Sequence, residues 1–201
     1  MIVIGLTGGI ASGKSTAALH LESRGARLID ADRLGHRAYE PGMPANAAIV
    51  AEFGDDVAGE GGVIDRRVLG GKVFGQPDAL KRLTDIVWPE IRRLAEAEIE
   101  AIASTDPDAV VVLEAAVLFE AGWEDAVDQI WVVLVEPAVA VERAMARDGA
   151  SAEAVQKRID AQLSNAERAA RAHVKIDNSG DTAALLAQLD AAWEQHAVKA
   201  P

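Results

Sequence analysis

Cysteine is absent from this chain of 201 residues. Without a thiol the chain cannot form a disulfide, a thiolate zinc site or a cysteine nucleophile. Disulfides are rare in reducing compartments, where thiols are kept reduced, so the absence fits such an environment. We therefore expect a cytoplasmic protein that performs its chemistry with other side chains.

Positive charge is scarce. The chain has 20 Lys and Arg against 32 Asp and Glu, which gives a formal net charge of −12. Proteins bind nucleic acid mainly by neutralising its phosphates with Lys and Arg, so we expect no nucleic-acid partner. Any phosphate group that the chain binds must be held by a local cluster of donors that acts against the overall field.

Long apolar runs and aromatic residues are also few. No apolar stretch approaches the roughly 20 residues that span a membrane, and residues 1–6 lack the preceding basic region of a signal peptide. We therefore expect no membrane partner. Aromatic residues make up only 4% of the chain, and abundant Ala and Leu favour helices over an all-β barrel. The length suits one α/β core with a small inserted subdomain.

Short apolar runs of the kind found in buried parallel strands recur along the chain. We expect strands at residues 2–6, 27–29, 109–113, 129–135 and 173–176. Each run is followed by a stretch of helical composition, such as residues 15–23 after the first. Strands that alternate with helices predict a doubly wound, parallel five-stranded sheet.

Two segments between the expected strands are helical. Residues 33–106 contain helix-like stretches at 44–53, 65–74 and 77–103. This segment is too long for a single crossover, and we expect an inserted subdomain at the carboxyl ends of the strands, where open α/β sheets bind ligands. Residues 139–171 form a second, Arg-rich segment. The core then comprises residues 1–32, 107–138 and 172–201, and it is closed by a helix at 181–196.

A glycine-rich motif follows the first expected strand. Residues 8–15 fit the pattern G-x-x-x-x-G-K-[ST], in which backbone N–H groups converge on nucleotide phosphates at the start of a helix. Lys14 adds a charge near the β- and γ-phosphates, and the Ser15 hydroxyl is placed to coordinate Mg²⁺. The alternative is a plain Gly-rich turn. We expect ATP at the loop formed by Gly9, Ile10, Ala11, Ser12, Gly13, Lys14, Ser15 and Thr16.

Two carboxylates close the second expected strand. Alternation along an extended segment sends Asp30 and Asp32 to the same side, and in a doubly wound sheet this strand end lies at the ligand crevice. Phosphoryl transfer to an alcohol requires a carboxylate that accepts the hydrogen bond of the attacking hydroxyl. We assign this role to Asp32. The alternative is that Asp32 caps the N-terminus of a following helix.

Glu114 follows the third expected strand directly. From this position an acid can reach Mg²⁺ through a bound water molecule. The alternative is a strand-end carboxylate without a metal. The chain has no Asn-Lys-x-Asp segment of the kind that reads a guanine base, which argues against a GTPase.

Arginines are concentrated in the second helical segment. Arg143 and Arg147 are four residues apart and therefore share one helix face. A lid that brings guanidinium groups onto transferring phosphates stabilises the developing charge and excludes water. We expect one or two of the arginines to be catalytic, with Arg143 and Arg147 first. The remainder are expected to be solvated and paired with acids, namely Arg158, Arg168 and Arg171.

From residue 2 to about residue 180 the chain resembles the dephospho-coenzyme A kinase family. The resemblance rests on the loop at residues 5–16 and on the order and spacing of further segments at 29–32, 40–42, 65–74, 114–120, 158–162 and 176–180. It implies a P-loop NTPase-type core, a coenzyme-A-binding helical insertion and a mobile helical lid. Where the family usually has His-Pro in its substrate domain, this chain has Trp88-Pro89.

The resemblance implies ATP-dependent phosphorylation of the ribose 3′-hydroxyl of dephospho-coenzyme A, the last step of coenzyme A synthesis. Asp32 would be the acceptor-side base, and Lys14 with an arginine of the 143–147 pair would clamp the phosphates. The partners would be the small molecules ATP and dephospho-coenzyme A, bound by a monomer or weak homo-oligomer. The residues themselves also allow another small-metabolite kinase, of the nucleoside monophosphate or shikimate type, or a nucleotide sensor that transfers nothing.

Overall fold

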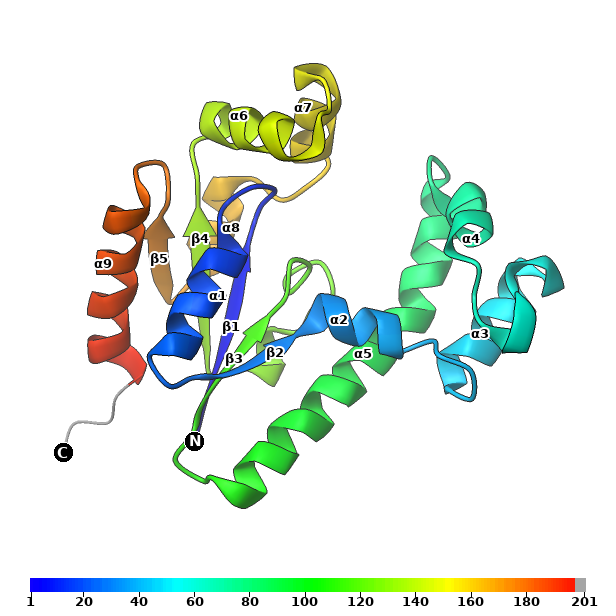
Figure 1. The fold of residues 1–201 in the computed structure, drawn as a ribbon, viewed down its shortest axis with the longest axis horizontal. Helices are drawn as coiled ribbons and strands as arrows, with labels where there is room; N and C mark the ends of the chain where they lie inside the picture. The colour runs from blue at the N-terminus through cyan, green and yellow to red at the C-terminus, as the bar shows by residue number, and fades with distance from the viewer. Residues whose placement is uncertain (198–201) are drawn as a thin grey trace. The chain divides into compact units, whose positions relative to one another are not determined.

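The computed structural model describes residues 1–197, and in this part of the chain five strands form one parallel sheet in the order β2-β3-β1-β4-β5 (Figure 1). The prediction of a doubly wound, five-stranded sheet is confirmed. The observed strands begin and end within about two residues of the expected runs and are β1 (Ile2–Gly8), β2 (Arg27–Asp30), β3 (Val110–Glu114), β4 (Gln129–Leu134) and β5 (Val174–Asp177).

The central strand β1 is almost entirely buried because neighbouring strands pair with it on both edges. Ile4 aligns with Val112 of β3 and with Gln129 of β4, while Leu6 aligns with Glu114 and Trp131. Burial on both faces explains why these strands are continuous apolar runs without polar alternation. The parallel pairing of β1 with β3 also places their carboxyl ends side by side, so the residues that follow them meet at one edge of the sheet.

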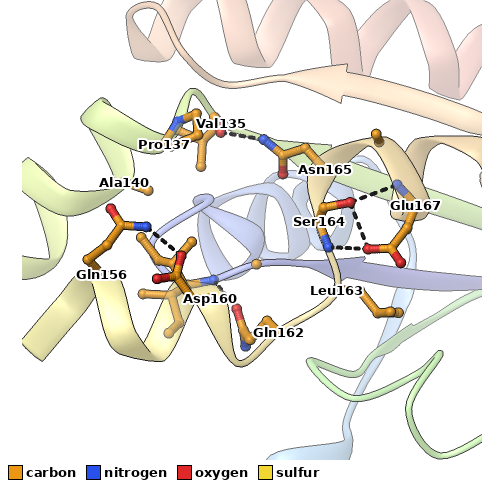
Figure 2. Close-up of a pocket in the computed structure, with 14 residues that line it drawn as sticks. Val135, Pro137, Ala140, Gln156, Asp160, Gln162, Leu163, Ser164, Asn165 and Glu167 are labelled. Atoms are coloured by element: carbon orange, nitrogen blue, oxygen red, sulfur yellow. Dashed lines mark hydrogen bonds between the residues drawn. The ribbon is translucent and has the colours of Figure 1, made fainter.

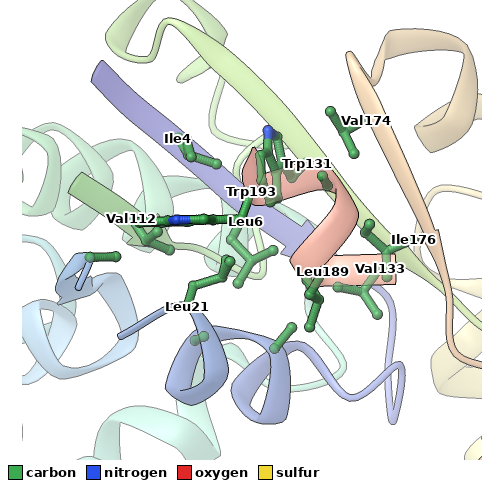
Figure 3. Close-up of a cluster of buried hydrophobic side chains, with 14 of the residues drawn as sticks. Ile4, Leu6, Leu21, Val112, Trp131, Val133, Val174, Ile176, Leu189 and Trp193 are labelled. Carbon is green, nitrogen blue, oxygen red and sulfur yellow. The ribbon is translucent and has the colours of Figure 1, made fainter. Parts of the chain in front are cut away.

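Helices α1 (Lys14–Ser23) and α9 (Thr182–Ala192) share a hydrophobic core with the sheet (Figure 3). Leu6 and Trp131 are fully buried in this core, and each such side chain contributes about 1.5–3 kcal/mol relative to an exposed one. Asp181 caps α9 by accepting a hydrogen bond from the Ala184 N–H group, as expected. The chain continues from α9 into a π-helical turn, Trp193–Ala197.

The chain divides into two compact units. The first comprises Met1–Ile29 together with the chain from Ala101 onward, and the second is Asp30–Glu100. The second unit is helical and contains α2 (Ala31–Arg37), α3 (Pro44–Phe53), α4 (Arg66–Val73) and most of α5 (Pro77–Thr105). The last three match the expected stretches, whereas α2 had not been predicted. Helices α3, α4 and α5 and the segment between α3 and α4 share a hydrophobic core, which is built from Ile49, Phe53, Val57, Ile64, Leu69, Val73 and Ala79.

The segment between β4 and β5 forms α6 (Pro137–Asp148), α7 (Ala152–Asp160) and α8 (Asn165–Arg171). Gly149 ends α6 in the left-handed conformation, and serines cap the two helices that follow. One part of the predicted alternation is wrong. Between β3 and β4 the chain forms turns and a 3₁₀ turn, Glu124–Ala126, in place of an α-helix.

Within residues 1–197, no helix is both long enough and apolar enough to cross a membrane.

Candidate active site

The glycine-rich motif forms a loop between the end of β1 and the start of α1. Gly13 precedes α1 with φ of 88°, a left-handed conformation that favours glycine. A Cβ atom at this position would lie 2.1 Å from Asn178 Nδ2. A Cβ atom on Gly8 would lie 2.6 Å from the Val133 carbonyl oxygen. Gly13 is therefore required both by its backbone conformation and by close packing, and Gly8 is required by close packing.

Ala11 at the tip of the loop also has a positive φ, 53°. A residue with a Cβ atom in the left-handed region costs about 1–2 kcal/mol. Such strain persists only where the surrounding structure fixes the backbone, and it is typical of ligand-binding segments. The Ser12 N–H group closes the loop by donating to the Gly9 carbonyl at 3.2 Å. The loop therefore has a defined backbone conformation, and its N–H groups lie directly before the N-terminus of α1.

Lys14, Ser15 and Glu114 meet at a single carboxylate oxygen. Lys14 Nζ donates to Glu114 Oε1 at 2.7 Å, and Ser15 Oγ donates to the same oxygen at 2.8 Å. The Lys14 and Glu114 side chains are 12% and 8% exposed, so water screens their attraction only weakly. Because β1 and β3 are paired, their carboxyl ends bring the start of α1 and Glu114 together, as the sequence predicted.

The donor set at this point fits a magnesium ion. Mg²⁺ prefers oxygen ligands and is commonly held by one or two protein groups, with water and phosphate oxygens completing the octahedron. The Ser15 hydroxyl and the Glu114 carboxylate are hard oxygen donors within hydrogen-bond distance of each other. No group of three or more His, Cys, Asp or Glu side chains that could hold a metal by itself occurs within the described residues. The site therefore suits a metal that arrives with a nucleotide.

Asn178, which directly follows β5, supports the loop, and Arg143 of α6 holds the segment that contains Asn178. Asn178 Nδ2 donates to the Ser12 carbonyl at 2.7 Å, and this amide is buried. Arg143 Nη1 donates to the Asn178 carbonyl at 2.7 Å, and its Nη2 donates to the Gly180 carbonyl at 3.0 Å. Sequence reasoning gave Asn178 no role of its own, although its segment contributed to the family resemblance.

Gln162 contacts the loop from the other side. Its Oε1 accepts a hydrogen bond of 3.0 Å from the Ile10 N–H group. The two residues border a cavity of about 590 Å³ between the loop and helices α6, α7 and α8 (Figure 2). Asp160 and Glu167 also line the cavity. Their carboxylates make it a poor place for a phosphate group.

Arg147 lies on the exposed end of α6. It pairs with the adjacent Asp148, with Nε to Oδ1 at 2.7 Å and Nη2 to Oδ2 at 3.0 Å. These hydrogen bonds raise the pKa of the Arg147 guanidinium and lower the pKa of the Asp148 carboxyl. Arg158 approaches the same carboxylate at 3.4 Å. The expected acidic pairing of the arginines is thus seen here, and Arg147 keeps its charge at every physiological pH.

Arg168 differs from the other arginines because it is fully buried. Its Nη2 donates to Glu120 Oε1 at 2.8 Å, and its Nε donates to the Leu163 carbonyl at 3.2 Å. Arg171 pairs with Glu124 and lies over the Phe119 ring at 4.3 Å from its centre. The prediction that Arg168 is solvated is wrong, since it ties α8 to the loop that follows β3.

The carboxylates after β2 are arranged differently from the prediction. Helix α2 begins at Ala31, so Asp30 and Asp32 do not alternate along one strand face. Asp30 is the N-cap, and its side chain accepts from the N–H groups of Asp32 at 2.9 Å and Arg33 at 3.1 Å. The alternative that Asp32 is the cap is therefore also wrong. Asp32 belongs to the second compact unit, where it is exposed in the first turn of α2.

Comparisons with known proteins identify the family. A model of the dephospho-CoA kinase family matches residues 2–184. The dephospho-CoA kinase of Geobacter sulfurreducens is 45% identical over 193 residues, which are 96% of this chain and 98% of that one.

Solved structures share the fold of this chain. A Thermus thermophilus protein superposes with a TM-score of 0.81 at 36% identity over 97% of both chains. The dephospho-CoA kinase of Campylobacter jejuni shares the fold, with a TM-score of 0.63 at 23% identity over 96% of both chains. With its phosphate loop, its five-stranded sheet and a family match over nearly its whole length, the chain belongs to the dephospho-CoA kinase family.

Proposed function

We propose that the chain transfers the γ-phosphoryl group of Mg·ATP to the ribose 3′-hydroxyl of dephospho-coenzyme A, using the phosphate loop and Asp32. The observation that carries the proposal is the meeting of Lys14, Ser15 and Glu114 beside the loop. In the transfer, the bond from the γ-phosphorus to the β–γ bridging oxygen breaks and a bond to the 3′-oxygen forms. The hydroxyl proton is released on the acceptor side.

The loop supplies the nucleotide site. Backbone N–H groups of residues 9–16 would hold the phosphates, assisted by the positive end of α1. Lys14 would turn from Glu114 to the β- and γ-phosphates, as its flexible side chain allows. Mg²⁺, when bound, neutralises negative charge on the phosphate oxygens. Ser15 would ligate it directly and Glu114 through water.

Asp32 is proposed to orient the acceptor. It lies two residues beyond the carboxyl end of β2, the edge of an open α/β sheet where ligands bind. The N-cap of α2 is supplied by Asp30, so the Asp32 carboxylate is not required for that role. Asp32 would accept the hydrogen bond of the 3′-hydroxyl, hold its oxygen in line with the γ-phosphorus and take up its proton.

Arg143 and Arg147 are proposed to act on the phosphates from the second helical segment. Both lie on α6 four residues apart, on one helix face. Arg143 is already fixed to two carbonyl groups beside the loop, which suits a positioning contact. Arg147 is exposed and bonds to the adjacent Asp148, so it could exchange this partner for a phosphate oxygen.

The remaining assignments follow the predicted division of the chain. Residues 33–106 would bind the coenzyme A moiety, residues 139–171 would close over the phosphates, and the rest would form the nucleotide-binding core. We also propose that the protein acts in the cytoplasm as a monomer or weak homo-oligomer. It would act on small molecules without a nucleic-acid or membrane partner.

Steady-state turnover of ATP with different acceptors tests the proposal. We expect dephospho-coenzyme A, and neither AMP nor shikimate, to stimulate ADP formation. Asp32→Ala should lower kcat by about 100-fold or more while leaving the nucleotide Kd nearly unchanged. Lys14→Ala should lower kcat and also weaken nucleotide binding. Equal loss of nucleotide binding and turnover in Asp32→Ala would contradict its role, and absence of stimulation by dephospho-coenzyme A would contradict the function.

A further inference from the structure

The hydrogen bond between Gln162 and Ile10 joins two segments that are 152 residues apart in the sequence. Ile10 lies in the phosphate loop, where backbone N–H groups are the expected phosphate ligands. Gln162 lies in the turn between α7 and α8. Figure 2 shows its side chain reaching from this turn to the loop backbone. The side-chain oxygen of Gln162 thus accepts the hydrogen bond of an N–H group that is expected to bind a nucleotide phosphate.

This contact excludes a phosphate oxygen from the same position. An N–H group has one hydrogen and makes one well-aligned hydrogen bond, so the Ile10 amide cannot donate fully to Gln162 and to a nucleotide. An oxygen of Gln162 also lies 3.5 Å from the place of a Cβ atom on Gly9. It therefore fills space next to two residues of the loop.

The turn that carries Gln162 is held firmly on its far side. The Leu163 carbonyl accepts from buried Arg168 at 3.2 Å, and Asn165 Nδ2 donates to the Val135 carbonyl at 2.7 Å. Ser164 and Glu167 form a capping box that begins α8. With these anchors in place, the Gln162 side chain is presented to the loop at little cost in conformational entropy.

We propose that Gln162 competes with a nucleotide phosphate for the Ile10 amide and thereby sets the nucleotide affinity. The proposal rests on the proposed function of the loop. Binding of the nucleotide displaces the Gln162 oxygen. Because this breaks the hydrogen bond between Gln162 and Ile10, the nucleotide binds less tightly than it would to a free loop. The coupling is reciprocal, so a nucleotide on the loop also releases the Gln162 side chain.

Replacement of Gln162 by Ala tests the proposal in the full-length protein. Calorimetric titration with ADP and with a non-hydrolysable ATP analogue should give a Kd about two- to tenfold lower for Gln162→Ala than for the wild type, since a neutral hydrogen bond of ordinary strength is removed from the competing state. The Ile10 amide proton should also shift upfield in the nucleotide-free variant, because its acceptor is gone.

Gln156→Ala is the matched control. Gln156 also lines the cavity, but its side-chain amide donates to Asp160 at 2.7 Å on its own helix, α7. We expect neither its nucleotide Kd nor its Ile10 amide shift to change. An unchanged or higher Kd in Gln162→Ala would overturn the competition, because a merely supporting side chain should weaken binding when removed. Failure of the wild type to bind either nucleotide would instead overturn the function proposed for the loop.

Discussion

Lys14 Nζ, at the start of α1, lies 2.7 Å from Oε1 of Glu114, the last residue of β3. Glu114 thereby neutralises a cation whose side chain is only 12% exposed and therefore largely removed from water. Ser15 donates to the same oxygen. One carboxylate therefore organises both the lysine proposed to bind phosphate and the hydroxyl proposed to bind the metal, which links the stability of the site to its proposed chemistry.

Glu114→Gln should weaken the binding of Mg²⁺ that turnover requires. The amide keeps the shape of the side chain, but it binds metal-coordinated water less well and no longer attracts Lys14. We expect the Mg²⁺ concentration for half-maximal rate to rise and kcat to fall, each by about 10–100-fold, as for other outer-shell metal groups. Steady-state rates across a Mg²⁺ titration at saturating ATP measure both quantities.

Glu153→Gln is a suitable control for this change. Glu153 is 82% exposed and pairs with the exposed Lys157 at 3.4 Å, so its replacement should leave the Mg²⁺ titration unchanged. If Glu114→Gln behaved like the control, the carboxylate would be a strand-end acid without a part in metal binding.

Local sequence patterns predicted the scaffold well because the forces behind them are local. The apolar run at residues 129–135 forms β4, which ends one residue earlier than predicted. The Gly-Lys-Ser motif lies at the α1 N-terminus as expected. Asn178 and Gln162 were not assigned roles. Their partners Ser12 and Ile10 lie 166 and 152 residues away, and only the tertiary fold brings them together.

The misassigned cap shows a different limit. Whether Asp30 or Asp32 caps α2 depends on the residue at which the backbone turns helical, and both have the right side chain for either position. A shift of two residues decides which carboxylate is occupied by backbone N–H groups. The identity of Asp30 as the cap is therefore a structural finding that the sequence could not provide.

Asp30→Ala should destabilise the protein without removing its chemistry. The change leaves the N–H groups of Asp32 and Arg33 without their side-chain acceptor. Loss of such a cap costs about 1 kcal/mol. Urea denaturation should show this decrease in the free energy of unfolding, and Asp30→Ser should restore most of it because serine is also a good cap.

The same variants separate the two carboxylates functionally. We expect Asp30→Ala to keep kcat within a few-fold of the wild type, in contrast to the large loss in Asp32→Ala. If Asp30→Ala lost activity by 100-fold while Asp32→Ala remained active, the acceptor-side role would belong to Asp30.

Glu167 should contribute to stability in a pH-dependent way. Hydrogen bonds from the Ser164 side chain, and then from its backbone, lower the pKa of Glu167 below its ordinary value of 4.5. A carboxyl whose pKa is lower in the folded state stabilises that state above the unfolded pKa. This contribution is fully present above about pH 4.5 and is lost as the pH falls through the lowered value.

Glu167→Ala therefore should be less stable than the wild type at pH 7, and the difference should shrink as the pH falls below about 4.5. Thermal unfolding of both proteins between pH 3 and pH 7 measures this trend. Glu153→Ala, which changes an exposed acid in the first turn of α7, controls for the loss of one negative charge. A stability difference for Glu167→Ala that stays constant over this range would show that the carboxylate charge has no part in the cap.

Arg168 should be a structural residue despite its place in the Arg-rich segment. Its guanidinium is fully buried and bonded to Glu120 and to the Leu163 carbonyl, while Nη1 has no hydrogen-bond partner within the described residues. Arg168→Ala removes these bonds and opens a cavity, so we expect the free energy of unfolding to fall by about 2–4 kcal/mol.

Arg158→Ala provides the comparison on the same segment. Arg158 is 57% exposed and lies 3.4 Å from its acidic partner, so its loss should change stability by no more than about 0.5 kcal/mol. Adding Glu120→Gln to Arg168→Ala should recover part of the lost stability, because the double variant no longer leaves a partly buried carboxylate without its cation. Urea denaturation of the three variants and the wild type would contradict the structural role if Arg168→Ala were as stable as Arg158→Ala. Its buried ion pair would then contribute nothing beyond its own desolvation cost.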